Sequence, residues 1–124
     1  MKHEPSPSRK PLDALALDRL RELDPDGRQG VLTRVLGAFE TSLARMLAQL
    51  RAEQDGGHAG VVAAVAHTLK SSSASVGALE LAQACADIEA RLRSGDASTL
   101  QQDISRLISE GESALAVVAS MLRP

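Results

Sequence analysis

Hydrophobic residues recur along the chain at intervals of three and four, with polar residues between them. This spacing places the hydrophobic side chains on one face of an α-helix, so it predicts amphipathic helices rather than strands. Short breaks rich in Gly, Asp and Ser separate five such segments. The helices are expected to span about residues 12–23, 28–53, 59–76, 78–93 and 98–122.

Residue types at the breaks indicate how several of these helices begin and end. Asp13 is expected to cap the first helix, and Asp24 to cap the second, with the proline that follows it in the first turn. Ser98 and Gln101 have the spacing of a capping box that opens the fifth helix. Gly77 is expected to close the third helix in a conformation with positive φ.

Composition favours an all-helical domain. The chain has 20 Ala and 18 Leu, and Phe39 is its one aromatic residue. Ala and Leu are strong helix formers, whereas sheets are usually rich in aromatic and β-branched residues. Gly111, in the middle of the fifth segment, weakens that helix by about 1 kcal/mol. Four long amphipathic helices with short links predict an antiparallel four-helix bundle, here with a short extra N-terminal helix.

The 124 residues suit one domain. We expect residues 12–124 to form the bundle. Residues 1–11 are polar and contain three prolines, so they are expected to be a disordered arm or a linker. They lack the apolar core of a signal peptide.

Charge and cysteine content narrow the partners. The net charge is −2, with basic and acidic residues mixed, so no basic stripe is available for nucleic acid. No apolar run is long enough to span a membrane. Cys85 alone permits neither an internal disulfide nor a cysteine metal cluster, and His58 and His67 lack the spacing of a helical metal site. We expect a cytoplasmic monomer without a bound metal, with Cys85 in the core.

His67 is the residue whose surroundings point to chemistry. On a helical wheel its ring lies about 140° from the hydrophobic face, so it is expected to face solvent. Lys70 is its surface neighbour, and Ser71 lies one turn above it. A lysine beside a histidine disfavours imidazolium. It suits a neutral imidazole that attacks as a nucleophile and then carries an anion.

Glu89 is expected to orient that ring. If Nε2 attacks a phosphoryl group, Nδ1 carries the hydrogen and needs an acceptor. His67 lies 11 residues before the break at Ala78, and Glu89 lies 11 residues after it. Antiparallel helices bring such residues to one height, about 16 Å from the turn. The carboxylate, partly solvated at the margin of its helix's hydrophobic face, would stabilise the positive charge that develops on the ring.

Residues 67–73, His-Thr-Leu-Lys-Ser-Ser-Ser, followed by Gly77, resemble the histidine phosphotransfer (HPt) domain of bacterial multistep phosphorelays. That family's pattern is a His, a Lys three residues on, Gly or Ser four residues on, further small residues and a Gly near ten residues on. It also places a Gln or Glu near 22 residues past the His, which is Glu89 here. The resemblance covers about residues 13–123, because the segment lengths match as well.

The resemblance implies that His67 accepts a phosphoryl group from an aspartyl phosphate on one receiver domain and passes it to the aspartate of another. Lys70 would attract the phosphoryl oxygens, and Glu89 would bond to Nδ1. Ser71 would be small so that a receiver loop can approach the ring. The residues expected to form the binding surface are Thr68, Ser71, Ser72 and Gly77.

The implied partners are response-regulator receiver domains and a sensor or hybrid histidine kinase. The receiver would bring Mg²⁺, so we expect no cofactor on this chain. The domain would be a phosphoryl carrier without autonomous kinase activity.

Two other function classes stay open. A kinase dimerisation domain also carries a phosphorylated His. In that class an acidic residue usually follows the His, and a Pro lies a few residues further on. Here Thr68 follows His67, and no Pro lies nearby. A helical scaffold would bind a signalling partner without accepting phosphate.

Ser72, one of the expected binding residues, also has a simpler structural role, because serine hydroxyls often bond to their own helix backbone.

Overall fold

The computed structural model describes residues 11–124, and all but the last residue of the expected N-terminal arm lies outside this range. Every regular element within residues 11–124 is a helix, so the expected all-α class is confirmed. The five helices are α1 (Ala14–Glu22), α2 (Val31–Ala52), α3 (Ala59–Ser75), α4 (Leu79–Arg93) and α5 (Leu100–Leu122).

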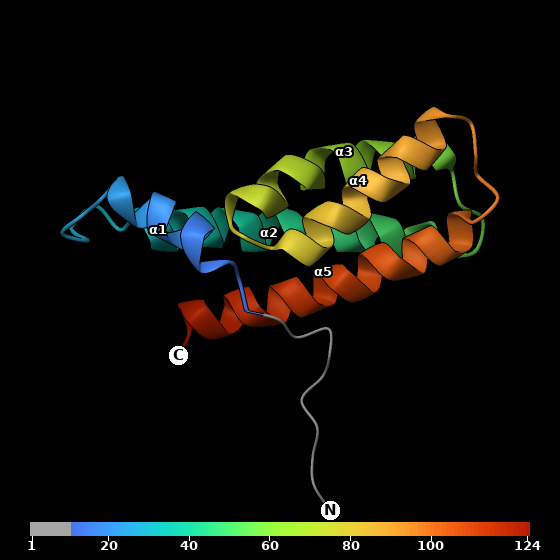
Figure 1. The fold of residues 1–124 in the computed structure, drawn as a ribbon. Coiled ribbons are helices and arrows are strands. Elements are labelled where there is room, and N and C mark those ends of the chain that lie inside the picture. Colours follow the sequence, from blue (N-terminus) through green and yellow to red (C-terminus); the bar gives the residue numbers. More distant parts are fainter. Residues whose placement is uncertain (1–10) are drawn as a thin grey trace, which may run out of the picture.

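Helices α2 to α5 form an antiparallel bundle, and α1 lies beside the N-terminal part of α2 (Figure 1). Helix α3 packs mainly against α4, and α2 packs mainly against α5. The α3–α4 turn lies at the same end of the bundle as α1 and the C-terminus (Figure 1). None of the helices in the described range combines the length and the apolar character needed to cross a bilayer.

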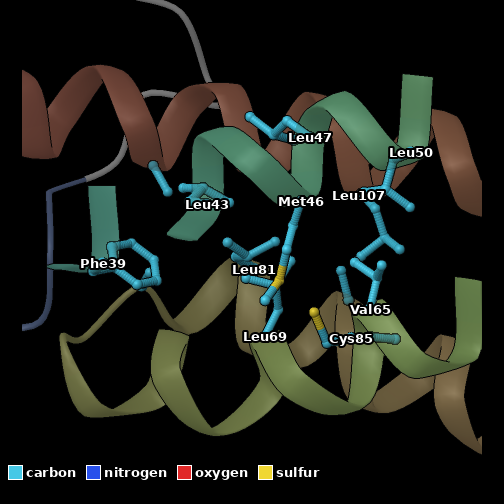
Figure 2. Close-up of a cluster of buried hydrophobic side chains, with 14 of the residues drawn as sticks. Phe39, Leu43, Met46, Leu47, Leu50, Val65, Leu69, Leu81, Cys85 and Leu107 are labelled. Carbon is cyan, nitrogen blue, oxygen red and sulfur yellow. The ribbon is translucent and has the colours of Figure 1, made fainter. Parts of the chain in front are cut away.

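Leucine side chains from all four bundle helices meet in the core (Figure 2). Leu43 of α2, Leu69 of α3, Leu81 of α4 and Leu107 of α5 are almost fully buried. Burial of each such side chain contributes about 1.5–3 kcal/mol to folding. Phe39 is also buried, in agreement with its place on the hydrophobic face of α2.

Cys85 lies among these core side chains as a free, buried thiol (Figure 2). Burial, together with the nearby negative charge of Glu89, raises the pKa of the thiol to about 12. The thiol is therefore protonated at neutral pH and is a poor nucleophile. Cys85 fills space in the core, as its position in the sequence suggested.

Gly111 lies in an uninterrupted α5 and brings that helix close to α2. A Cβ at this position would lie 2.6 Å from Cδ2 of Leu47, a side chain that is fully buried. The helix propensity lost at glycine is thus accompanied by closer packing between α2 and α5.

Gly77 and Asp13 join α1 to the α3–α4 turn. The backbone N–H of Asp13 donates to the carbonyl oxygen of Gly77 at 2.9 Å, and the Asp13 carboxylate caps α1 by accepting from the N–H of Ala16 at 3.1 Å. Gly77 has φ +81°, and a Cβ there would lie 2.6 Å from the Asp13 nitrogen. Glycine is therefore required both for the turn and for the close approach of α1.

The expected start of α2 was wrong by three residues, because Asp24 does not occupy the N-cap position. Its carboxylate instead accepts hydrogen bonds across a loop, from the N–H of Gln29 at 3.1 Å and from that of Val31 at 3.2 Å. Gly30 is the N-cap residue, with φ +63°. Asp24 still satisfies the first N–H of the helix, but from outside it, and its proline lies in the loop.

The expected capping box at the start of α5 was also wrong. The hydroxyl of Ser98 donates to Asp96 at 2.6 Å instead of capping the helix. Thr99 is the N-cap residue, and its hydroxyl donates to the Asp103 carboxylate at 3.2 Å. Gln101 is exposed. A neighbouring acceptor thus competes successfully for the serine that the sequence pattern singled out.

Candidate functional site

His67 lies on the outer surface of the α3–α4 hairpin, and its side chain is 71% exposed. Ala66 and Leu69 lie on the inward face of α3 and are fully buried. Their burial fixes the rotation of α3 and directs position 67 outward. The ring therefore faces solvent, as the helical wheel predicted.

Glu89 accepts a hydrogen bond from the His67 ring, with 2.5 Å between Nδ1 and Oε2. A carboxylate can only accept, so the hydrogen of a neutral ring lies on Nδ1 and Nε2 keeps the lone pair. Counting residues from the α3–α4 turn thus predicted correctly that His67 and Glu89 lie at the same level along the two antiparallel helices. The Glu89 side chain is only 10% exposed, more buried than its place at the margin of the hydrophobic face suggested.

Lys70 also contacts this carboxylate, with 2.5 Å between Nζ and Oε1 of Glu89. Hydrogen bonds from Lys70 and then from His67 lower the pKa of the Glu89 carboxyl from its ordinary value of 4.5 to about 2, although burial opposes this shift. Glu89 is therefore ionised throughout the physiological range. Lys70 is therefore hydrogen-bonded to the same carboxylate that orients the His67 ring.

Arg93 forms an ion pair with Glu89 and was missed by the sequence reasoning. Its Nη2 lies 3.2 Å from Oε2, the same oxygen that accepts from His67, and its side chain is 69% exposed. A signal was present, because residues four apart on a helix are surface neighbours and a Glu–Arg pair at this spacing is common. Two hydrogen-bond donors and one further cation thus contact a single carboxylate at the edge of the α3–α4 interface.

The other residues expected in the binding surface fall into two groups. Thr68 and Ser71 are exposed beside His67. The hydroxyl of Ser72 lies 3.4 Å from the carbonyl oxygen of Thr68 and therefore turns back toward its own helix. Gly77 is buried against Asp13 in the turn that follows α3.

A groove of about 450 Å³ runs between α2 and α3. Its walls are mostly apolar, and the exposed edge of Val61 adds to this character. The residues that line it are Met46, Gln49, Gly60, Val61, Ala64, Val65 and Thr68. Thr68, which follows His67 in α3, is one of the lining residues, and His67 itself is not among them. In residues 11–124, no three His, Cys, Asp or Glu side chains are grouped so that they could hold a metal ion.

Fold and site together define a class: a four-helix bundle with an exposed histidine whose Nε2 is free to react. Comparison with known families gives the same answer, because the Hpt domain model matches residues 34–118. The chain therefore belongs to the histidine phosphotransfer (Hpt) domain family. No curated protein and no solved structure matches the chain.

Membership in this family assigns the chain a role in histidine phosphotransfer within phosphorelays. Hpt domains are phosphocarrier modules that interact with receiver domains and kinases. The matched segment contains most of the bundle, together with His67, Lys70, Glu89 and Arg93.

Proposed function

We propose that His67 accepts a phosphoryl group from the aspartyl phosphate of a receiver domain and passes it to the aspartate of another. The observation that carries this proposal is the hydrogen bond between Nδ1 of His67 and the Glu89 carboxylate, with the other face of the ring exposed. A ring held in this way presents the Nε2 lone pair to an incoming phosphorus atom.

In the proposed step, Nε2 forms a bond to phosphorus while the bond from phosphorus to the aspartyl oxygen breaks. The receiver's carboxylate is the leaving group. The ring gains a positive charge because Nδ1 keeps its hydrogen, and the Glu89 carboxylate stabilises that charge. The reverse step delivers the phosphoryl group to the second receiver.

Lys70 would turn from Glu89 toward the phosphoryl oxygens as the group arrives. Its side chain is 38% exposed, so the ammonium can reach solvent and an incoming group. Mg²⁺ would be bound by the receiver and not by this chain. The domain would act as a carrier without autonomous kinase activity, as a monomer in the cytoplasm.

The receiver would dock over the α2–α3 groove and the surface around Thr68 and Ser71. The groove supplies apolar area that reaches Thr68, and interfaces usually have an apolar centre with a polar rim. Thr68 and Ser71 are small enough to let another molecule approach Nε2. An exposed ring without large neighbours is what a group-transfer partner needs.

The proposal is tested by incubating the protein with a phosphorylated receiver and, separately, with ATP alone. We expect acid-labile, base-stable phosphate to appear with the receiver only. His67→Ala should abolish this label. His58→Ala is the matched control, because His58 is also exposed and its Nδ1 also contacts a glutamate, Glu53, at 2.7 Å.

Other results would favour the competing function classes. Labelling by ATP alone would indicate a kinase. A protein that takes no label from any receiver of its own genome would be better described as a scaffold. Equal labelling of His67→Ala and wild-type protein would remove His67 from the mechanism.

A further inference from the structure

Two cations lie on opposite sides of the His67 ring along the bundle axis. On α3, Lys70 lies about one turn toward the C-terminus from His67. On α4, which runs antiparallel, Arg93 lies about one turn beyond Glu89 and so toward the α3 N-terminus. Both cations contact the same carboxylate, at different oxygens.

The surface between Arg93 and the ring has no large side chain on α3. The positions four and seven residues before His67, which share its face, are Ala63 and Gly60. Arg93 itself is 69% exposed. Its guanidinium can therefore leave Glu89 and move along α3 toward the ring without displacing a packed side chain.

The charge balance of the site favours movement of Arg93 from Glu89 toward the phosphoryl group. Before phosphorylation, Lys70 and Arg93 outweigh Glu89 by one positive charge, with the ring neutral. The phosphoryl group brings about two negative charges, and the ring becomes positive while Nδ1 keeps its hydrogen. The phosphorylated site is then close to neutral with Arg93 and carries about one negative charge without it.

We propose that Arg93 is a second phosphoryl-binding residue, held by Glu89 in the unphosphorylated protein and transferred to the phosphoryl oxygens when His67 is modified. The inference rests on the proposed function of His67. Glu89 keeps its bond to Nδ1, while Lys70 and Arg93 approach the phosphoryl group from either side. A guanidinium suits this role because its planar fork donates two hydrogen bonds to phosphate oxygens at once.

The test uses the full chain and phosphoramidate, a small donor that needs no receiver. In this reaction Nε2 of His67 bonds to phosphorus, the phosphorus–nitrogen bond of the donor breaks and ammonia leaves. The pKa of the resulting phosphoryl group is then measured by ³¹P NMR titration from mildly acidic to mildly alkaline pH, because the second proton of such a group leaves at about pH 6. A cation near the phosphoryl group favours its dianion and lowers this pKa.

Arg93→Gln keeps much of the side-chain stem but removes the charge, so we expect it to raise the pKa of the phosphoryl group. Arg93→Lys should restore most of the wild-type value. The control is Arg51→Ala, which removes an exposed arginine from an ion pair with Glu112, between α2 and α5 and away from the site. It should leave the titration unchanged. Added salt should reduce the difference between wild type and Arg93→Gln.

The outcomes separate this inference from the function on which it rests. If wild-type protein forms phosphohistidine but Arg93→Gln titrates like wild type, Arg93 does not bind the phosphoryl group and the function of His67 stands. An equal shift in Arg51→Ala would attribute the effect to net charge and would also overturn the inference. If neither phosphoramidate nor any receiver phosphorylates wild-type His67, the proposed function and this inference both fail.

Discussion

Glu89 is the residue on which the geometry of the site depends. One carboxylate accepts hydrogen bonds from the His67 ring and from Lys70, forms an ion pair with Arg93, and is only 10% exposed. It fixes the tautomer of the ring and holds both cations at the carboxylate that is bonded to Nδ1. Removal of this side chain should therefore affect chemistry much more than folding.

Glu89→Ala should slow phosphotransfer by about 10-fold to 100-fold, the usual effect of losing a residue that orients a reactive histidine. Glu89→Gln should be less affected, because its amide oxygen can still accept from Nδ1. Rates are measured by rapid-quench transfer from a phosphorylated receiver, with circular dichroism as the control for folding. An unchanged rate in Glu89→Ala would remove Glu89 from the mechanism.

The lowered pKa of Glu89 also predicts a pH dependence of stability. A carboxyl group with a folded pKa below its ordinary value stabilises the fold when ionised, so the contribution is complete above about 4.5 and is lost as the pH falls toward about 2. The difference in unfolding free energy between wild type and Glu89→Gln should be constant above about pH 5 and should shrink below it. Unfolding is measured from about pH 5 to about pH 2.5, which covers most of the range in which Glu89 becomes protonated. If the difference in unfolding free energy stays constant over this range, the lowered pKa of Glu89 is contradicted.

Sequence reasoning succeeded at residue scale where a position is set by helix geometry. The outward direction of His67 and its height relative to Glu89 follow from periodicity and from the location of one turn. The contact of Lys70 could not be obtained in this way, because its long side chain reaches several acceptors and the choice depends on the position of a carboxylate on another helix. The Arg93–Glu89 pair could have been found, because the two residues lie four apart on one helix.

At the scale of elements, Gly77 connects the short α1 helix to the functional hairpin. Its positive φ ends α3, and its missing side chain lets Asp13 bond to the turn. All five helices could be predicted from hydrophobic periodicity. The starts of α2 and α5 could not, because Asp24 and Asp96 bind groups across their loops instead of following the usual capping patterns.

Gly77→Ala should destabilise the protein by about 1–3 kcal/mol, from strain at positive φ and from the clash with the Asp13 backbone. Hydrogen exchange in α1 should become faster, because its anchor is disturbed. The matched control is Gly37→Ala in α2, where a Cβ meets no atom within 4 Å and should stabilise the helix by about 0.5–1 kcal/mol. Equal unfolding midpoints for Gly77→Ala and wild type would contradict this account.

For the molecule as a whole, the bundle buries leucines from each of its four helices and leaves Thr68 and Ser71, two small residues of α3, beside one exposed imidazole. The core of Ala and Leu with a single buried aromatic permits this close packing. The antiparallel arrangement was predictable from four long helices and short links. The α2–α3 groove was not, because its shape depends on how far apart two helices lie.

Ser71→Gln tests the docking surface at this scale. A longer side chain one turn above His67 should weaken receiver binding by about 10-fold or more, because it obstructs the approach to the ring. Stability should change little, since Ser71 is exposed. Affinity is measured by calorimetry with an unphosphorylated receiver. Wild-type affinity in Ser71→Gln would show that the partner does not approach over this residue.

The central claim is that Nε2 of His67 carries the phosphoryl group while Nδ1 stays bonded to Glu89. Its most direct test is heteronuclear NMR of the ¹⁵N-labelled protein after phosphorylation by a receiver. The account predicts a phosphorus–nitrogen coupling at Nε2 of His67 and a retained hydrogen on Nδ1. Coupling at Nδ1, or phosphate on any residue other than His67, would contradict it.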